Sequence, residues 1–287
     1  MRFFALHEGL YEGVQNRLDQ FEAACKTLSV EFIPLDSQKL NHAALPSLGN
    51  GDLLYNVSRG SSFTEFSLLS NDVTTFYVET PRLPLANTDT VQYAALHAKL
   101  DIPQPKTIFH LTANRDLLKS YVDYLGGFPI IIKAAGSSRG IGVMKVDSMA
   151  SLFSVADYLL KVGGEFILRQ YLRGDAVGRC RVLGNRVIQM YDFPLLGSDF
   201  RTACLPLSDL PPVFARDYST DIQQLCVRAS HLANFQFAAV DFMLDSSSSA
   251  LLLEVNCPAG MPPHWRESGN RVALEAVSFL KAKALGV

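Results

Sequence analysis

The first part of the chain alternates short apolar runs with helical periodicity. Apolar runs at residues 2–6, 30–35, 53–57 and 75–78 predict strands, and a short helix is predicted over residues 63–70. Between the first two runs, apolar residues recur with the helical period at Val14, Leu18, Phe21, Cys25 and Leu28. This βαβ opening predicts a small open parallel sheet that extends to about residue 85.

After a proline-rich segment, PRLPLAN, the pattern changes. A helix over residues 89–100 runs into IPQPKT, whose prolines forbid its continuation. From residue 128 the pattern predicts a strand, a glycine-rich loop and a strand, in FPIIIK, AAGSSRGIG and VMKV. A helix over residues 152–160 and a strand over residues 166–170 follow.

The last third predicts two hairpins and two helices. The first hairpin turns at Gly184 and Asn185, and the proline-rich stretch 194–214 predicts loops. A helix over residues 221–234, capped by Ser219 or Thr220, precedes the second hairpin. A helix over residues 270–284 closes the chain.

The second hairpin, residues 238–256, contains one carboxylate in each apolar run. A turn centred between Ser247 and Ser248 places Asp241 opposite Glu254, and Asn256 then shares the strand face of Glu254. Directly opposed side chains lie about 5 Å apart at Cβ, where like charges repel. The pair is tolerable if one carboxyl stays protonated, if the turn is offset, or if a divalent cation lies between them. The alternative is an exposed hairpin with two solvated acids, whereas two carboxylates and an amide oxygen are ligands that suit Mg²⁺.

Composition narrows the class of protein. A formal net charge of −2 gives no electrostatic reason to expect nucleic acid or a membrane as partner. The five cysteines are scattered and form no CxxC pair, which indicates a reducing compartment rather than disulfides or a thiolate zinc site. The amino-terminal apolar run is too short for a signal peptide, and no apolar run has the length of a membrane span. We expect a cytoplasmic protein of two or three compact units.

Lys133 and the glycine-rich loop after it are candidates for phosphate contacts. The loop offers backbone N–H groups and little bulk, although it is no P-loop, and a tight hairpin is the alternative. Lys133 ends an apolar strand, where its ammonium can reach either a phosphate or solvent.

Three arginines are further candidates. Arg201 is isolated in a proline-rich region, and its guanidinium suits a terminal phosphate or an acyl phosphate, with an ordinary surface arginine as the alternative. Arg179 and Arg181 alternate along one strand and share one face, as an anion-binding patch or as a solvated sheet face.

Taken in order, these parts resemble the ATP-grasp superfamily, in particular its RimK-like and LysX-like amino-acid ligases. The resemblance rests on the strand lysine, the glycine loop, the Gln-Tyr-Leu stretch and, most strongly, LEVNCPAG followed by SGNRVALEAV. It implies an α/β fold, α+β in its C-terminal part. Its units would be an N-terminal Rossmann-like open-sheet domain over residues 1–85, a central lobe with the glycine-rich loop over 86–165, and a C-terminal lobe with the Mg²⁺-binding hairpin over 166–287, with ATP held between the two lobes.

The resemblance implies a nucleotide-binding role for several residues. Lys133 would contact the α and β phosphates, and a loop would close over the triphosphate with Gly136, Ser137, Ser138, Gly140 and Gly142. The adenine edge would be formed by Gln170 and the backbone of Tyr171 and Leu172, and Asp175 is the nearest acid for the ribose hydroxyls.

The resemblance also implies a metal and an acceptor site. One or two Mg²⁺ ions, for which Mn²⁺ can substitute, would be held by Asp241, Glu254 and Asn256. Arg201 would steady the γ-phosphate, and Arg179 would face the acceptor carboxylate or the transferred phosphate. Around the acceptor we expect Arg179 together with Arg59, Gly260, His264 and Arg266, although a packing or surface role is the alternative for His264.

The resulting hypothesis is an ATP-dependent carboxylate–amine ligase that forms an amide or peptide bond through an acyl phosphate. Its partners would be carboxylates and amines or amino acids, with a peptide or carrier-protein tail and a homo-oligomer left open. A nucleotide-binding regulatory or scaffold module that has lost activity is the second hypothesis, favoured by Thr90 and Ala203, which depart from the family pattern, as does Val177. The third is kinase-like phosphoryl transfer to a hydroxyl.

Overall fold

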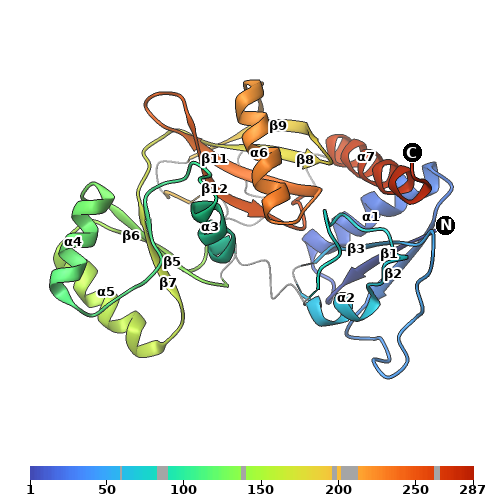
Figure 1. Cartoon of the computed structure of the whole chain (residues 1–287), viewed down its shortest axis with the longest axis horizontal. Helices are drawn as coiled ribbons and strands as arrows, with labels where there is room; N and C mark the ends of the chain where they lie inside the picture. Colours follow the sequence, from blue (N-terminus) through green and yellow to red (C-terminus); the bar gives the residue numbers. More distant parts are fainter. Residues whose placement is uncertain (59, 83–89, 137–139, 196–198, 202–212, 262–265) are drawn as a thin grey trace.

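The computed structural model describes the chain except for residues 59, 83–89, 137–139, 196–198, 202–212 and 262–265, and except for the side chains of residues 90 and 266–268. Within this described part the strands form three sheets, which lie in a row along the longest axis of the molecule (Figure 1). The four-stranded sheet lies at one end, the five-stranded sheet in the middle and the three-stranded sheet at the other end.

The N-terminal unit contains the predicted parallel sheet. Its elements are β1 (Arg2–His7), α1 (Glu12–Thr27), β2 (Glu31–Asp36), β3 (Leu53–Asn56) and α2 (Ser62–Leu68). β1 is the middle strand and pairs in parallel with both β2 and β3, so the βαβ opening is confirmed. The apolar stripe of α1 faces this sheet, and the rings of Phe3 and Phe21 stack with centroids 5.4 Å apart.

The prediction of a strand over residues 75–78 is wrong. This segment forms only isolated bridges, from Thr74 to Leu53 and from Tyr77 to Phe235. The carbonyl of Thr74 accepts a hydrogen bond from the backbone N–H of Leu54 on β3. The carbonyl of Phe76 accepts one from Gln236, just before the last hairpin. Because the segment changes neighbours within three residues, it makes no ladder, but it joins the N-terminal unit to the middle of the molecule.

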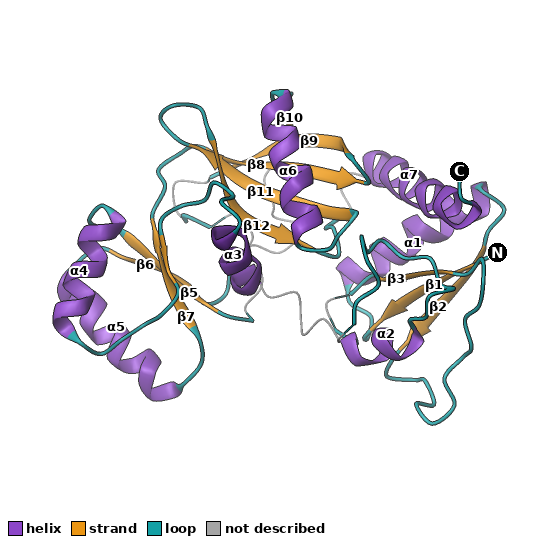
Figure 2. Cartoon of the chain, in the orientation of Figure 1, coloured by secondary structure: helices purple, strands orange, loops and turns teal. Residues whose placement is uncertain are grey.

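The central lobe is an antiparallel sheet in the order β4-β7-β5-β6, with two helices on one side of it (Figure 2). Its elements are β4 (Thr107–Ile108), α4 (Arg115–Leu125), β5 (Ile130–Ala134), β6 (Val143–Val146), α5 (Met149–Val162) and β7 (Phe166–Gln170). β5, β6, α5 and β7 were predicted from the sequence, whereas β4 and α4 were not. Helix α4 is capped by Asn114, whose side chain accepts hydrogen bonds from the backbone of Asp116 and Leu117, and it buries Leu118, Val122 and Leu125.

The C-terminal lobe is an antiparallel sheet in the order β10-β9-β8-β11-β12. Its elements are β8 (Ala176–Leu183), β9 (Arg186–Pro194), β10 (Phe214–Ala215), α6 (Thr220–Leu232), β11 (Phe237–Leu244), β12 (Ala250–Asn256) and α7 (Arg266–Leu285). The hairpin turning at Gly184 and Asn185 is confirmed, and Ser219 caps α6. The predicted helix α3 (Thr90–Lys99) packs on this lobe, where the His97 ring meets the carbonyl of Ala229 at 3.0 Å.

The last hairpin reaches the predicted register by an unexpected route. Leu244 pairs with Ala250, so the turn is centred on Ser247, where the Asp245 carboxylate accepts the backbone N–H groups of Ser247 and Ser249. A bulge then inserts Leu253 as an extra residue in β12, which restores the pairing of Asp241 with Glu254. The pairing of the two acids is therefore confirmed, although the predicted turn centre was wrong by half a residue.

The described part of the chain has three buried apolar clusters, of which the smallest lies within the N-terminal unit around Phe4 and Leu54. One buried cluster runs from the N-terminal unit into the C-terminal lobe, where the ring of Phe237 lies 5.8 Å from that of Tyr55 and 5.0 Å from that of Phe76. Helix α7 lies along α1 at the same junction (Figure 1). The central lobe has its own core beneath α4 and α5. The division at residues 85 and 165 stays a prediction.

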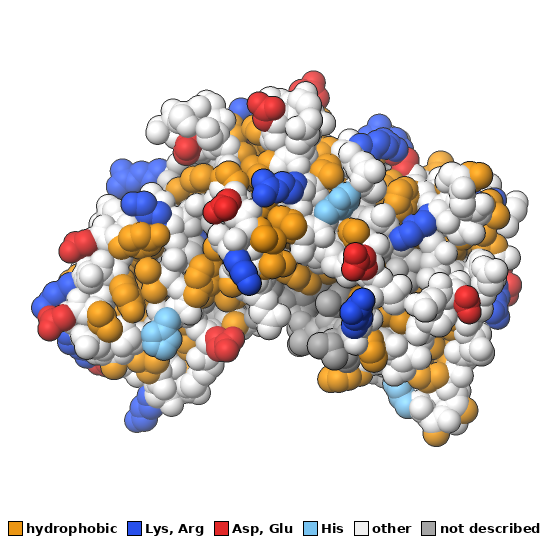
Figure 3. All heavy atoms as spheres, viewed as in Figure 1, with side chains coloured by type: hydrophobic (Ala, Val, Ile, Leu, Met, Phe, Trp, Pro, Cys, Tyr) orange, Lys and Arg blue, Asp and Glu red, His pale blue; other side chains and the backbone are white. Residues whose placement is uncertain are grey.

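The visible surface mixes acidic and basic side chains (Figure 3), in keeping with the small net charge. Its outline is indented between the central lobe and the N-terminal unit. None of the helices in the described part of the chain combines the length and the apolar character that crossing a membrane requires.

Replacing Phe237 with alanine tests the shared core. Phe237 is fully buried at the junction of two sheets, so Phe237→Ala should lower the free energy of unfolding by about 3 to 5 kcal/mol. Phe63→Ala, at a ring that is 76% exposed, should change it by less than about 0.5 kcal/mol. Urea denaturation measures both values, and an equal loss in the two variants would contradict the assigned core.

Candidate functional site

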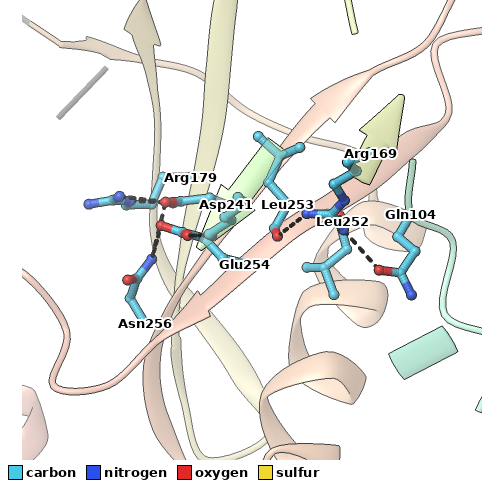
Figure 4. A network of polar contacts seen from close by, with 9 residues as sticks. Gln104, Arg169, Arg179, Asp241, Leu252, Leu253, Glu254 and Asn256 are labelled. Atoms are coloured by element: carbon cyan, nitrogen blue, oxygen red, sulfur yellow. Dashed lines mark hydrogen bonds and ion pairs between the residues drawn. The ribbon is translucent and has the colours of Figure 1, made fainter. Parts of the chain in front are cut away.

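Three polar side chains of the last hairpin meet at the end of the C-terminal sheet (Figure 4). Asp241 on β11 and Glu254 on β12 are directly paired, and Asn256 donates its Nδ2 to both, at 3.2 Å to Asp241 Oδ2 and 3.0 Å to Glu254 Oε1. Asp241 and Asn256 are buried. The hairpin with solvated acids is therefore not what the structure contains.

Two cations from two different sheets neutralise the two carboxylates. Arg179 on β8 lies opposite Asp241 and binds it in a bidentate manner, with Nη2 2.6 Å from Oδ2 and Nε on Oδ1. Lys133 on β5 reaches across from the central lobe and places Nζ 2.8 Å from Glu254 Oε2. Opposed carboxylates on paired strands are tolerated here because each has its own cation and the Asn256 amide bridges them.

Burial and charge act in opposite directions on the Asp241–Arg179 pair. Burial raises the pKa of the Asp241 carboxyl above its ordinary value, and Arg179 offsets only part of this effect. Burial also acts to lower the pKa of Arg179, but the Asp241 charge outweighs it, so this pKa lies above its ordinary value. The guanidinium therefore stays charged, and the charge of Asp241 depends on it.

The two arginines of β8 are not the solvated face that the sequence analysis allowed. Arg181 is 1% exposed and donates to Gln189 Oε1, to the Tyr191 hydroxyl at 3.2 Å, and to the carbonyl of Gly260. Burial lowers its pKa, and Arg179 adds to this effect. Arg181 thus holds the loop that follows β12. The same loop lies close to Arg179, because a Cβ added at Gly260 would be 3.8 Å from Arg179 Nη1.

The structure brings Arg201 to the glycine-rich loop. Its guanidinium binds Asp199, at 3.0 and 2.8 Å, and donates to the carbonyl of Gly140 at 3.2 Å. Gly140 has φ +71°, and a Cβ on it would lie 3.3 Å from Arg201, so a larger residue is disfavoured twice. Gly136 and Gly142 also have positive φ, in a loop that connects the antiparallel strands β5 and β6.

The segment predicted at the adenine edge follows β7. Gln170 accepts a hydrogen bond from the backbone of Lys106 at 3.4 Å, and the Lys145 ammonium lies 5.5 Å from the centre of the Tyr171 ring. Leu172 is half-buried, whereas Asp175 is exposed.

Several predicted residues lie outside the described part of the chain. These are Arg59, Ser137, Ser138, His264 and the side chain of Arg266, together with Ala203 and the side chain of Thr90.

The sequence analysis missed two features of the site. It did not pair Arg179 with Asp241, because this contact requires β8 and β11 to be neighbours, and the order of strands was not predicted. It also passed over Arg169, which is buried beside β12. An arginine at the fourth of five strand positions, directly after three apolar residues in FILRQ, is the one available indication of burial.

Breaking the Arg179–Asp241 pair should be costly. Arg179→Met leaves a buried carboxylate without its cation and should lower the free energy of unfolding at neutral pH by about 3 to 5 kcal/mol. Adding Asp241→Asn should recover most of the loss, because the amide carries no charge. Urea denaturation checks both, and Arg186→Met, at an exposed ion pair with Glu275, is the control.

The deficit of Arg179→Met should depend on pH in a defined direction. Without Arg179, the pKa of folded Asp241 rises further above the ordinary value of 3.8, so the folded chain holds this proton more tightly than the unfolded chain. The deficit should vanish at acid pH and grow as pH rises from the raised pKa of Asp241 in the folded wild type to its still higher pKa in the folded variant. A deficit that does not change between acid and neutral pH would contradict a buried, unpaired Asp241.

Known proteins resemble this chain in sequence and in fold. The RimK-like ATP-grasp domain family matches residues 87–280. A probable alpha-L-glutamate ligase of Saccharophagus degradans is 25% identical over 199 residues, which cover 68% of this chain and 64% of that protein. A protein of the same name from Mannheimia succiniciproducens is 27% identical over 192 residues, covering 66% and 62%. The chain therefore spans less than two thirds of the length of these relatives.

Solved structures share the fold at low sequence identity. D-cycloserine synthetase DcsG has a TM-score of 0.73 at 14% identity, covering 98% of this chain and 99% of that one. The ATP-grasp ligase PsnB, complexed with a minimal precursor, has a TM-score of 0.69 at 16% identity, covering 97% and 100%. D-alanine–D-alanine ligase from Bacillus anthracis, complexed with ATP, also has a TM-score of 0.69, at 15% identity, covering 99% and 97%. With its α/β fold shared with these ATP-grasp ligases and two thirds of its length matched by the family, the chain belongs to the RimK-like ATP-grasp domain family.

Proposed function

We propose that this protein is an ATP-dependent carboxylate–amine ligase. A substrate carboxylate would attack the γ-phosphate to give an acyl phosphate and ADP, and an amine would then displace phosphate to form an amide. The observation that carries the proposal is the contact between the two lobes, in which Lys133 Nζ of the central lobe lies 2.8 Å from Glu254 Oε2 of the C-terminal lobe.

The charges around this point favour an anionic ligand. Four cationic side chains surround the two carboxylates, namely Lys133, Arg169, Arg179 and Arg181. A triphosphate that enters beside this cluster would meet a surplus of positive charge in a partly desolvated place, where electrostatic stabilisation is strong. These groups influence one another's charge: Glu254 acts to raise the pKa of Arg169, and Arg179 acts to lower the pKa of Arg181.

The donor set fits Mg²⁺. Asp241, Glu254 and Asn256 supply hard oxygens, and Mg²⁺ is typically bound by one or two carboxylates together with phosphate oxygens and water. Among the described residues no three His, Cys, Asp or Glu side chains lie together as metal ligands, whereas the proposed donor set contains two acids and an amide. Bound Mg²⁺ would neutralise charge on the transferring phosphoryl group. Asn256 would have to turn its Oδ1 toward the metal.

The chain's own residues would position the substrates. The Lys133 ammonium, which donates to Glu254, would also donate to a phosphate oxygen. The backbone N–H groups of the glycine-rich loop would cover the triphosphate. Arg201 holds the carbonyl of Gly140, so it would place this loop in addition to steadying the γ-phosphate. Arg179 would act chiefly on Asp241, with the loop at Gly260 beside it.

Amino acids or peptides are the substrate class that we propose. The relatives are named glutamate ligases, and among the structural neighbours are D-alanine–D-alanine ligase and a ligase complexed with a precursor peptide. Each of these names refers to an amino acid or a peptide.

Removal of the Glu254 charge tests the proposal. Glu254→Gln should lower Mg²⁺-dependent ADP release, measured with carboxylate and amino-acid pairs, by at least about 100-fold, because it removes a metal ligand and the partner of Lys133. Glu275→Gln, at a helix surface with Arg186, should leave the rate unchanged.

Hydroxylamine distinguishes ligation from the other two hypotheses. An acyl phosphate gives a hydroxamate, whereas a phosphate ester formed by a kinase does not. If the wild-type protein consumed no ATP with any pair, or if Glu254→Gln retained full activity, the ligase proposal would be wrong.

A further inference from the structure

Arg169 is a buried arginine that no carboxylate pairs with among the described residues. It lies on β7, one position before Gln170, and is 7% exposed. Its guanidinium is satisfied entirely by neutral acceptors, with Nε 3.2 Å from Thr107 Oγ1, Nη1 2.9 Å from Leu253 O, and Nη2 2.8 Å from Gln104 Oε1 and 3.3 Å from Leu252 O. Figure 4 shows this group beside the acidic cluster.

A buried charge held only by neutral groups is costly, so its retention needs a reason. Burial lowers the pKa of Arg169 to about 10, and the Glu254 charge acts in the opposite direction. The guanidinium is thus charged at neutral pH and senses the acid that lies one residue beyond the carbonyl of Leu253. A neutral side chain would fill the same space at a smaller electrostatic cost.

The contacts of Arg169 coincide with the bulge in β12. In a regular strand the carbonyls of neighbouring residues point to opposite sides, yet the carbonyls of Leu252 and Leu253 both accept from this one guanidinium. The extra residue at Leu253 is what brings Glu254 opposite Asp241. Among the described strands β12 is also the edge strand of its sheet, so no described strand pairs with it on the side of these carbonyls.

The same side chain joins the two lobes. β7 belongs to the central sheet and β12 to the C-terminal sheet, whose apolar cores are separate. The backbone of Leu252 also donates to Pro103 O at 2.8 Å, and Gln104 accepts from Arg169, so the segment before β4 completes the tie.

We propose that Arg169 is a positioning residue, which fixes the bulge at Leu253 and thereby holds Glu254 in place to bind the metal and to face Lys133 across the lobes. The inference rests on the proposed function, since it assigns Glu254 to Mg²⁺. It adds a dependence of the metal site on a residue that contacts neither metal nor nucleotide.

Arg169→Met removes the donors and nearly keeps the volume. Two results are expected. In the ligand-free protein, hydrogen exchange at residues 250–257 should become faster. In turnover, the Mg²⁺ concentration for half-maximal rate should rise by about tenfold or more, while kcat at saturating Mg²⁺ changes by less than about twofold. A general loss of stability would not separate these two kinetic quantities.

Two further variants complete the test. Thr107→Val removes one acceptor of the Arg169 guanidinium and keeps the shape of the side chain. The exchange rate and the Mg²⁺ requirement should therefore rise as in Arg169→Met, but by less. If Arg169→Met does not fold, Thr107→Val is the deciding variant. Arg115→Met, at a surface arginine of the same lobe that binds Asp157, should shift neither.

The inference is overturned if exchange at residues 250–257 is unchanged, or if kcat falls while the Mg²⁺ requirement stays constant. If the wild-type protein does not use ATP, the proposed function fails, and exchange at residues 250–257 alone then confirms or overturns the tie between Arg169 and β12.

Discussion

The structure of the site depends on two carboxylates that are held opposite each other on paired strands. Asp241 cannot keep its charge there without compensation, because burial and the facing charge of Glu254 both disfavour its ionisation. Arg179 and Lys133 provide that compensation from two different sheets, and Asn256 bridges the acids. The pairing of charges therefore also joins the lobes, because the cation of one acid belongs to the central lobe.

The fold delivers these groups by simple means. The order β8-β11-β12 places Arg179, Asp241 and Glu254 in one row across three strands. The bulge at Leu253 corrects the register that the serine turn sets, and Arg169 holds the bulge from the neighbouring sheet. The N-terminal unit shares its core with the C-terminal lobe, so the acidic strands rest on a continuous apolar base. Membership of the RimK-like ATP-grasp family agrees with the proposed role of this row in binding nucleotide and metal.

Much of this could be predicted from the sequence, where the information is local. Strand period, caps and turn residues identified most elements, and the symmetry of the hairpin brought Asp241 to Glu254. Contacts that depend on the order of strands could not be predicted this way. The Arg179–Asp241 pair needs β8 beside β11, and the ties of Arg169 need β7 beside β12. The correct register itself arose from two departures that cancel, an offset turn and a bulge, of which the residue pattern showed neither.

The most direct test of the central claim is a crystal structure with Mg²⁺ and a non-hydrolysable ATP analogue. A metal ion is expected at about 2.0 to 2.1 Å from oxygens of Glu254, Asn256 and the phosphates. Asp241 should lie beside the metal, and the Lys133 ammonium should have moved from Glu254 toward a phosphate. A nucleotide bound elsewhere, with the Lys133–Glu254 and Arg179–Asp241 pairs unchanged and no metal between the acids, would contradict the central claim.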